Sequence, residues 1–257
     1  MTHHTRETSP QIYARIGGVL YLILILAGMF GVIFVRDKLI VSGDVTATAN
    51  NITAFPLLWR IGIAGDLIMH VCDVPLMLIF YVLLRPVNKS LALLAVLFNL
   101  VQTAVLVANK LNLLAALFLL GGADYLKAFE PHQLHALSYL SLKLHDYGFG
   151  VGLIFFGCEC LVVGYLILRS GYLPKTIGVL MQIAGVCYLT NSFALLLAPT
   201  FASIIFPAIL VPAFMAELSL CLWLIVKGVN VPKWELHASV GRASEASMDI
   251  VAGKKGL

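Results

Sequence analysis

Long apolar runs are the feature that most restricts how this chain can fold. Six segments each hold about 20 or more mainly apolar residues, the length that an α-helix needs to cross the hydrocarbon core of a bilayer. With 60% hydrophobic and only 12% charged residues, the chain has too few polar side chains for the surface of a soluble domain. We therefore predict an all-α, polytopic membrane protein with six transmembrane helices in one bundle. The predicted spans are residues 12–35, 57–84, 91–120, 145–168, 174–197 and 203–226.

The spans divide the chain into three parts and indicate its orientation. Residues 1–11 are predicted to be a cytoplasmic segment, residues 12–232 the transmembrane domain, and residues 233–257, which are rich in small and polar side chains, a disordered cytoplasmic tail. Residues 41–56 are expected to form an external loop. Lys and Arg are concentrated in the loops on the side of the two termini, which places both termini in the cytoplasm. This asymmetry explains the net charge of +4, so no nucleic-acid partner is expected.

An internal repeat places acidic residues near the middle of the membrane. Residues 159–175 read ECLVVGYLILRSGYLPK and residues 217–233 read ELSLCLWLIVKGVNVPK, and the two align without a gap. Each begins with a glutamate, ten residues before a basic residue at the inner end of its span. Ten helical residues rise about 15 Å, which puts Glu159 and Glu217 at matching heights near mid-membrane. Asp73, twelve residues before Arg85, lies close to the same level.

Ionised side chains at this depth predict a polar site inside the bundle. A charge at the bilayer centre costs about 2.5–3.5 kcal/mol on insertion scales, so such residues face the interior and have partners. In the segment GDLIMHVCDVP, residues 65–75, the two aspartates and the histidine share one helix face. Pro75 lies beside them, and Pro207 and Pro212 are expected to kink the last span. The predicted ligand or ion site consists of Asp73, Glu217, Glu159, Asp66, His70, Gln102 and Asn99.

A second polar group is predicted nearer the outer surface. Its members lie in the outer halves of their spans or beside them, and they would continue the polar seam outward. In this group Lys110 is expected to extend its ammonium toward the outer interface. The predicted outer group consists of Arg60, Asn109, Lys110, His145, Asp146 and Asn191.

Three kinds of function fit these residues. Carboxylates that lie close together in a low dielectric bind and release protons or cations, as in a small-solute, ion or lipophilic-ligand carrier. Asp and His side chains also hold divalent metals, whose bound water could hydrolyse a lipid-like substrate, and His70, His145, Asp66 and Asp73 are the candidate ligands. The third alternative is a non-catalytic scaffold, because Gly148, Gly152 and Gly157 permit close packing within one chain or between two.

Motifs add little about catalysis, cofactors or partners. The sequence contains no nucleotide-binding loop, nucleophile elbow, haem-attachment motif or dinucleotide fingerprint, so no cofactor is evident and an enzymatic role is the less favoured reading. The partners expected are the lipid bilayer, a small-molecule or lipid ligand and, as an open alternative, a second copy of the chain.

Several long motifs resemble one membrane-protein family. RIGGVLYL, GDLIMHVCDVPL, LHDYGFGVGLIFFG and AELSLCLWLIVKGVN are similar to the bacterial family called domain of unknown function 4386, over about residues 13–230. The resemblance implies a six-helix protein of the bacterial inner membrane without an assigned reaction. In the family pattern position 70 is more often apolar and position 159 varies. The pattern matches Arg60, Asp66, Asp73, Arg85, His145 and Glu217, and it thereby favours Asp66, Asp73, His145 and Glu217 among the candidates.

Overall fold

The helical architecture is as predicted. A computed structural model describes residues 9–240, and all regular secondary structure within that range is helical. The predicted fold class is confirmed, because six helices are long and apolar enough to cross a membrane and they pack together. Those helices are Pro10–Leu39, Pro56–Leu84, Lys89–Leu119, Pro131–Ser170, Lys175–Leu197 and Ala208–Val226.

The spanning helices form a closed up-and-down ring. Around the ring, α1 packs against α4, α4 against α5, α5 against α6, α6 against α7, α7 against α9, and α9 against α1. We call the end of the bundle where α1 begins and α9 ends the inner end, and the opposite end the outer end. The elements are α1 (Pro10–Met29), η1 (Phe30–Arg36), α2 (Asp37–Leu39), α3 (Val45–Ala54), α4 (Pro56–Leu84), α5 (Lys89–Leu119), η2 (Asp124–Ala128), α6 (Pro131–Ser170), α7 (Lys175–Leu197), α8 (Pro199–Ile205), η3 (Ala208–Leu210) and α9 (Val211–Val226).

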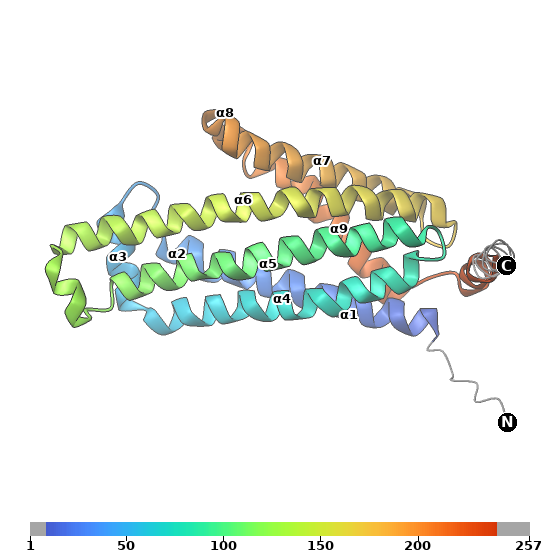
Figure 1. Cartoon of the computed structure of the whole chain (residues 1–257), viewed down its shortest axis with the longest axis horizontal. Helices are drawn as coiled ribbons and strands as arrows, with labels where there is room; N and C mark the ends of the chain where they lie inside the picture. Colours follow the sequence, from blue (N-terminus) through green and yellow to red (C-terminus); the bar gives the residue numbers. More distant parts are fainter. Residues whose placement is uncertain (1–8, 241–257) are drawn as a thin grey trace, which may run out of the picture.

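The helices differ in length, so the ring is taller on one side. Helices α4, α5 and α6 run along most of the long axis of the molecule, whereas α7, which packs against α6, and α9, which packs against α7, extend over only the inner part of the bundle (Figure 1). Helix α6 has 40 residues and is therefore about 60 Å long, twice the thickness of a hydrocarbon core. The predicted span 145–168 is thus the inner part of a longer helix, whose first turns pack against α3.

Two local expectations differ from the structure. The segment expected to be an external loop contains α3, whose N-terminus is capped by Asp44 through a 2.8 Å bond from the Ala47 amide. Helix α4 continues through Pro75, in agreement with the predicted span 57–84. The last span is interrupted rather than kinked, because α8 ends at Ile205 and α9 begins after η3 at Val211. Pro212 lies in the first turn of α9, where the missing N–H costs no hydrogen bond.

Part of the expected disordered tail is helical. Residues 231–240 form a helix at the inner end, and Trp234 packs against the adjacent apolar core. The Trp234 indole N–H donates to the Leu83 carbonyl oxygen at 3.0 Å, and the Tyr172 hydroxyl donates to the same oxygen at 2.6 Å. The Trp234 bond connects the C-terminal helix to the end of α4, and the Tyr172 bond connects the segment between α6 and α7 to the same place. The rest of the expected tail, residues 241–257, lies outside the described residues.

Glycines allow the helices around α6 to approach closely. A Cβ atom on Gly152 would lie 2.5 Å from Leu106 of α5, and a Cβ on Gly157 would lie 3.0 Å from the Gly185 carbonyl oxygen of α7. A Cβ on Gly164 would lie 2.7 Å from the Gly178 carbonyl oxygen, also on α7. The small residues noted in the sequence therefore serve packing within the chain.

Two apolar cores lie at the two ends of the bundle. The inner core includes Leu76, Leu83 and Leu84 of α4, Ala92 and Ala95 of α5, and Leu220 and Leu224 of α9. The outer core includes Trp59 and Ile63 of α4 and Leu113 of α5. The polar residues of α4 and α5 fall between these two sets, so the cores fix the height of the polar region by burying apolar surface on either side of it.

Candidate functional site

Carboxylates from three helices meet at one level of the bundle. Asp73 lies 11 residues before the end of α4, Glu159 lies 11 residues before the end of α6, and Glu217 lies nine residues before the end of α9. At 1.5 Å per residue these carboxylates are about 14–17 Å from the inner end, close to the half-thickness of a hydrocarbon core. The internal repeat and the position of Asp73 thus correspond to a real convergence in space.

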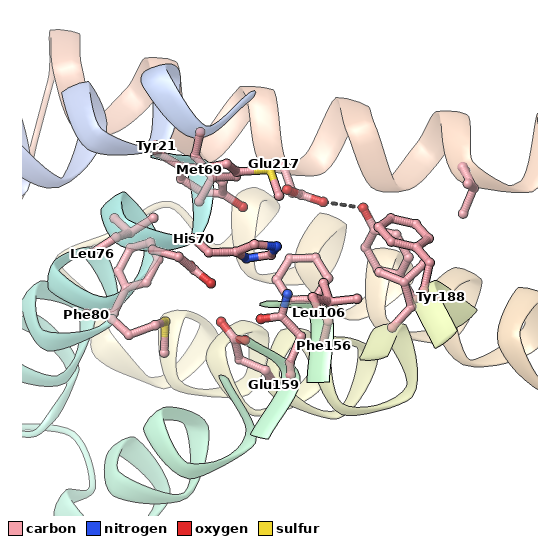
Figure 2. Close-up of a pocket in the computed structure, with 17 residues that line it drawn as sticks. Tyr21, Met69, His70, Leu76, Phe80, Leu106, Phe156, Glu159, Tyr188 and Glu217 are labelled. Atoms are coloured by element: carbon pink, nitrogen blue, oxygen red, sulfur yellow. Dashed lines mark hydrogen bonds between the residues drawn. The ribbon is translucent and has the colours of Figure 1, made fainter. Parts of the chain in front are cut away.

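A cavity of about 220 Å³ lies at this level, inside the ring. All six spanning helices contribute to its wall, together with η3, which provides Leu210. The wall contains the three carboxylates, one imidazole, one amide and two phenols, and the rest of it is apolar (Figure 2). The polar lining residues are Tyr21, His70, Asp73, Gln102, Glu159, Tyr188 and Glu217.

One buried asparagine connects two of the carboxylates. The side-chain amide Nδ2 of Asn99 donates to Asp73 Oδ2 at 3.1 Å and to Glu159 Oε2 at 3.2 Å. The hydroxyl of Thr103 donates to the same Asp73 oxygen at 2.8 Å. Asn99 is fully buried, although it does not line the cavity itself, so it acts behind the cavity wall. Helix α5 places both donors against Asp73 because positions 99 and 103 are one turn apart.

The third carboxylate has a different partner. The hydroxyl of Tyr188 on α7 donates to Glu217 Oε1 on the neighbouring helix α9 (Figure 2). The ring of Tyr188 also packs against Phe156 of α6, with the ring centroids 5.0 Å apart. On the α1 side, Tyr21 makes an edge contact with Phe80 at 6.1 Å. The carboxylates are therefore held by neutral donors, with an aromatic pair on either side of the cavity.

The imidazole of His70 points into the cavity between Glu217 and Glu159 (Figure 2). Its side chain is only 2% exposed, and Nε2 has no hydrogen-bond partner within the described structure. A buried polar atom without a partner costs about 1–3 kcal/mol, so it is a position where a ligand atom gains a hydrogen bond.

Asp66 belongs to a separate ionic cluster above the cavity. Its Oδ2 accepts from Arg36 Nη1 at 2.6 Å and from Lys110 Nζ at 2.9 Å, and the Asp66 side chain is 1% exposed. Lys110, expected at the outer interface, is instead buried at 3% exposure because its ammonium has this carboxylate as a counter-ion. Asp66 does not line the cavity.

Glycine in the first span makes room for the ionic cluster. A Cβ atom on Gly31 would collide with Asp66 Oδ1 and would lie 3.3 Å from Arg36 Nη2. Gly31 and Arg36 belong to η1, a π-helical segment, and such segments are rare in proteins and frequent at functional sites. The wider turns of η1 precede the guanidinium that pairs with Asp66.

The predicted outer group does not come together as one cluster. The Asn109 amide donates to the His145 carbonyl oxygen at 2.8 Å, and both side chains are buried beside the ionic cluster. Arg60 is exposed, and the Asp146 carboxylate is 58% exposed and 3.8 Å from His145 Nδ1. Asn191 is buried on α7.

The candidate metal ligands are not arranged for a metal ion. Within residues 9–240, no three His, Cys, Asp or Glu side chains lie close enough together to hold one. Asp66 is bound by two cations, and Asp73 by Asn99 and Thr103. His70, His145, Asp66 and Asp73 thus do not fit a shared divalent ion, which normally takes three or four ligands.

Four residues of the site were not predicted from the sequence. In the sequence Arg36 has the position of an ordinary basic residue at the end of a span, and Thr103, Tyr21 and Tyr188 resemble the many hydroxyl side chains that occur in transmembrane helices. Hydrogen-bonding capacity alone does not separate such residues from ordinary packing residues. Only the ring arrangement of the helices brings their hydroxyls and guanidinium to the carboxylates.

Comparison with other proteins places the chain in a family. The family model described as "Domain of unknown function (DUF4386)" matches residues 16–228. The chain is also 31% identical over 166 residues to an "Uncharacterized protein" of the archaeon Archaeoglobus fulgidus, an alignment that covers 65% of this chain and 83% of the relative. No solved structure matches the chain. The expectation from the sequence motifs is confirmed: this multi-span membrane protein belongs to the DUF4386 family.

Proposed function

We propose that this protein is a small-molecule carrier that binds its solute in the central cavity and exchanges protons there. The observation that carries the proposal is the convergence of Asp73, Glu159 and Glu217, from three helices, on one cavity near mid-membrane. Carboxylates at this depth are costly, and a protein keeps them where ions, protons or solutes pass.

The charge balance of the cavity supports proton or solute exchange. Three carboxylates line it, and no Lys or Arg is among the lining residues within the described chain. Because separated charges in a low dielectric must be neutralised, either protons or a cationic solute has to compensate them. Binding of the cationic solute would then release protons, and binding of protons would release the solute, which is the elementary step of a proton-coupled carrier.

The interruption between α8 and α9 also supports a carrier. Non-helical backbone at membrane depth is tolerated where it lines a cavity, and broken helices are common at the binding sites of secondary transporters. Here η3 separates the two helices, and its Leu210 lines the cavity. The Asp66 cluster on the outer side of the cavity would have to separate for a solute to pass outward.

The competing functions have less support. A scaffold needs only carboxylates that are hydrogen-bonded between helices, and it does not require a cavity or the unpartnered Nε2 of His70. A metal-dependent enzyme needs a ligand group that these residues do not form. We further propose the inner membrane of a bacterial cell as the location, with both termini in the cytoplasm and residues 12–232 as the functional domain.

Native mass spectrometry of gently solubilised protein tests the proposal without knowledge of the solute. We expect a bound small molecule in the wild type that is absent from Asp73→Asn and from Glu217→Gln. The control is Glu235→Gln, at an exposed position, and its thermal unfolding should equal that of the wild type. In proteoliposomes that enclose a pH dye, addition of the released molecule should drive proton movement in wild type only. Equal occupancy and equal proton movement in wild type and both cavity variants would exclude the carrier.

A further inference from the structure

We propose that the solute of the cavity is an organic cation, with one ammonium group on an apolar body that contains about one ring. The proposal rests on the proposed function and specifies the chemical class that the same site takes. Its first basis is charge: the lining has three carboxylates, and within residues 9–240 no basic side chain other than His70 contributes to it. A cation here gains counter-ions when the carboxylates release their protons, whereas an anion finds no counter-ion among the Asp and Glu side chains of the lining.

Aromatic rings on both sides of the cavity give the second basis. Tyr21 and Phe80 lie on one side in Figure 2, and Phe156 and Tyr188 on the other. The ring planes within these pairs are inclined by 79° and 55°, so the two rings of each pair are not parallel. A cation within about 6 Å of a ring face is attracted by the ring quadrupole, most strongly where water is excluded.

The size of the cavity limits the body of the solute. An apolar cavity of about 150 Å³ accommodates benzene, and this one has about 220 Å³. The additional volume suits an ammonium group with small substituents next to one ring. Leu106 and Leu153 belong to the apolar part of the wall, which provides surface for the ring rather than for hydration water.

Two further features separate an organic cation from a bare ion. No three carboxylate, thiol or imidazole side chains of the described residues are close enough to form the compact oxygen or nitrogen shell that a metal ion needs. The unpartnered Nε2 of His70, which is aimed into the cavity, can bond a polar atom of a solute that lies between Glu159 and Glu217. A molecule with a cationic head and an apolar body contacts the carboxylates and the rings simultaneously.

Three single-ring probes of similar size test the class. Benzyltrimethylammonium is the cation, neopentylbenzene is its neutral isostere with carbon in place of nitrogen, and phenylacetate is the anion. Binding of each to protein in nanodiscs is measured by titration calorimetry, with empty nanodiscs subtracted. The variants are Glu217→Gln and Phe156→Leu for the site, Leu153→Trp to fill the cavity, and exposed Glu235→Gln as the matched control.

We expect only the cation to bind the wild type and the Glu235→Gln control. Its affinity should fall about tenfold or more in Glu217→Gln and roughly threefold or more in Phe156→Leu. Leu153→Trp, or Leu153→Phe if the larger residue prevents folding, should abolish binding.

Two outcomes would overturn the proposal, and they differ in their meaning for the carrier. If neopentylbenzene or phenylacetate binds as tightly as the cation and is lost in Leu153→Trp, the cavity is a solute site but the cationic class is wrong. If no probe responds to any cavity variant, and native mass spectrometry finds no bound molecule, both the class and the carrier function are excluded.

Discussion

Lys110 Nζ lies 2.9 Å from Asp66 Oδ2, the same oxygen that accepts the Arg36 guanidinium at 2.6 Å. One carboxylate is thus the shared counter-ion of two cations from two other helices, and the cluster joins η1, α4 and α5 between the outer core and the cavity. Because all three groups are largely buried, each depends on the others, and breaking the cluster exposes charge to a medium of low dielectric.

Removing the shared carboxylate should therefore destabilise the protein strongly. We expect Asp66→Asn to lower the free energy of unfolding by about 3–5 kcal/mol, since it leaves two buried cations without a counter-ion. The double variant Asp66→Asn with Lys110→Met should recover part of the loss, because the more deeply buried cation is then also removed. Denaturant unfolding in mixed micelles measures both. Equal stability of wild type and Asp66→Asn would contradict a buried ion cluster.

Gly31 should be sensitive to a single added methyl group. In Gly31→Ala the new Cβ collides with Asp66 Oδ1, and we expect a loss of about 1–3 kcal/mol in stability from overpacking. The matched control is Gly65→Ala on α4, whose Cβ would meet only Phe30 Cδ1 at 3.8 Å. This control should be neutral or slightly stabilising, because alanine favours a helix. Denaturant unfolding midpoints of Gly31→Ala and Gly65→Ala measure the difference. An equal effect of the two substitutions would argue against a close approach of Gly31 to Asp66.

Thr103 offers a test of the hydrogen bonds around Asp73. Thr103→Val keeps the shape of the side chain but removes the hydroxyl that donates to Asp73 Oδ2 at 2.8 Å, whereas Thr103→Ser retains a hydroxyl. We expect Thr103→Val to cost about 1–3 kcal/mol of stability and to weaken solute binding, because a buried acceptor loses a donor. Thr103→Ser should bind solute like the wild type. If valine and serine behave alike in calorimetry, the hydroxyl has no role.

The contact between α6 and α7 should tolerate no side chain at Gly164. A Cβ there would lie 2.7 Å from the Gly178 carbonyl oxygen and 2.9 Å from the Gln182 nitrogen, and neither backbone atom can move without shifting a helix. Gly164→Ala is expected to lower the unfolding midpoint by several degrees. Gly28→Ala is the control, since its Cβ meets only the flexible Met69 sulfur at 3.1 Å. A midpoint for Gly164→Ala at or above that of the control would contradict this packing.

Orientation is testable with reporter fusions. A fluorescent protein fused after residue 257 should fluoresce, because basic loops at the inner end predict cytoplasmic termini. Alkaline phosphatase inserted after Gly122, between α5 and η2, should be active. Exchange of the two reporters should silence both. Activity in the opposite pattern would reverse the orientation and, with it, the direction assigned to the Asp66 cluster.

The sequence predicted the acidic site through spacing along single helices. The repeat gave Glu159 and Glu217 matching heights, and the GDLIMHVCDVP segment gave Asp66, His70 and Asp73 one face, because helical rise and periodicity depend only on residue number. The same spacing could not assign Asp66 to a different cluster from Asp73. Its partners are Arg36 and Lys110, which lie 30 and 44 residues away in the chain.

The break in the last span shows that proline positions in the sequence do not by themselves predict where a helix is interrupted. Pro207 and Pro212 both suggested a kink, yet Pro212 fits the first turn of α9, and the interruption lies at η3. Whether proline bends, breaks or begins a helix depends on which neighbouring groups take up the freed backbone acceptors. The helical part of the tail was missed for a related reason, since it is stabilised by Trp234 against Leu83 on α4.

By itself, the sequence determined that the chain is a bundle of six membrane-spanning helices with carboxylates near mid-depth. Span length and hydropathy are local properties, and the bilayer forces apolar segments of this length into helices. Tertiary structure alone decided that these helices close into a ring, that aromatic pairs border the carboxylates, and that Lys110 is buried against Asp66. Those features depend on which helix faces meet, and that is set by the packing of small residues and buried polar partners between helices rather than by any one segment.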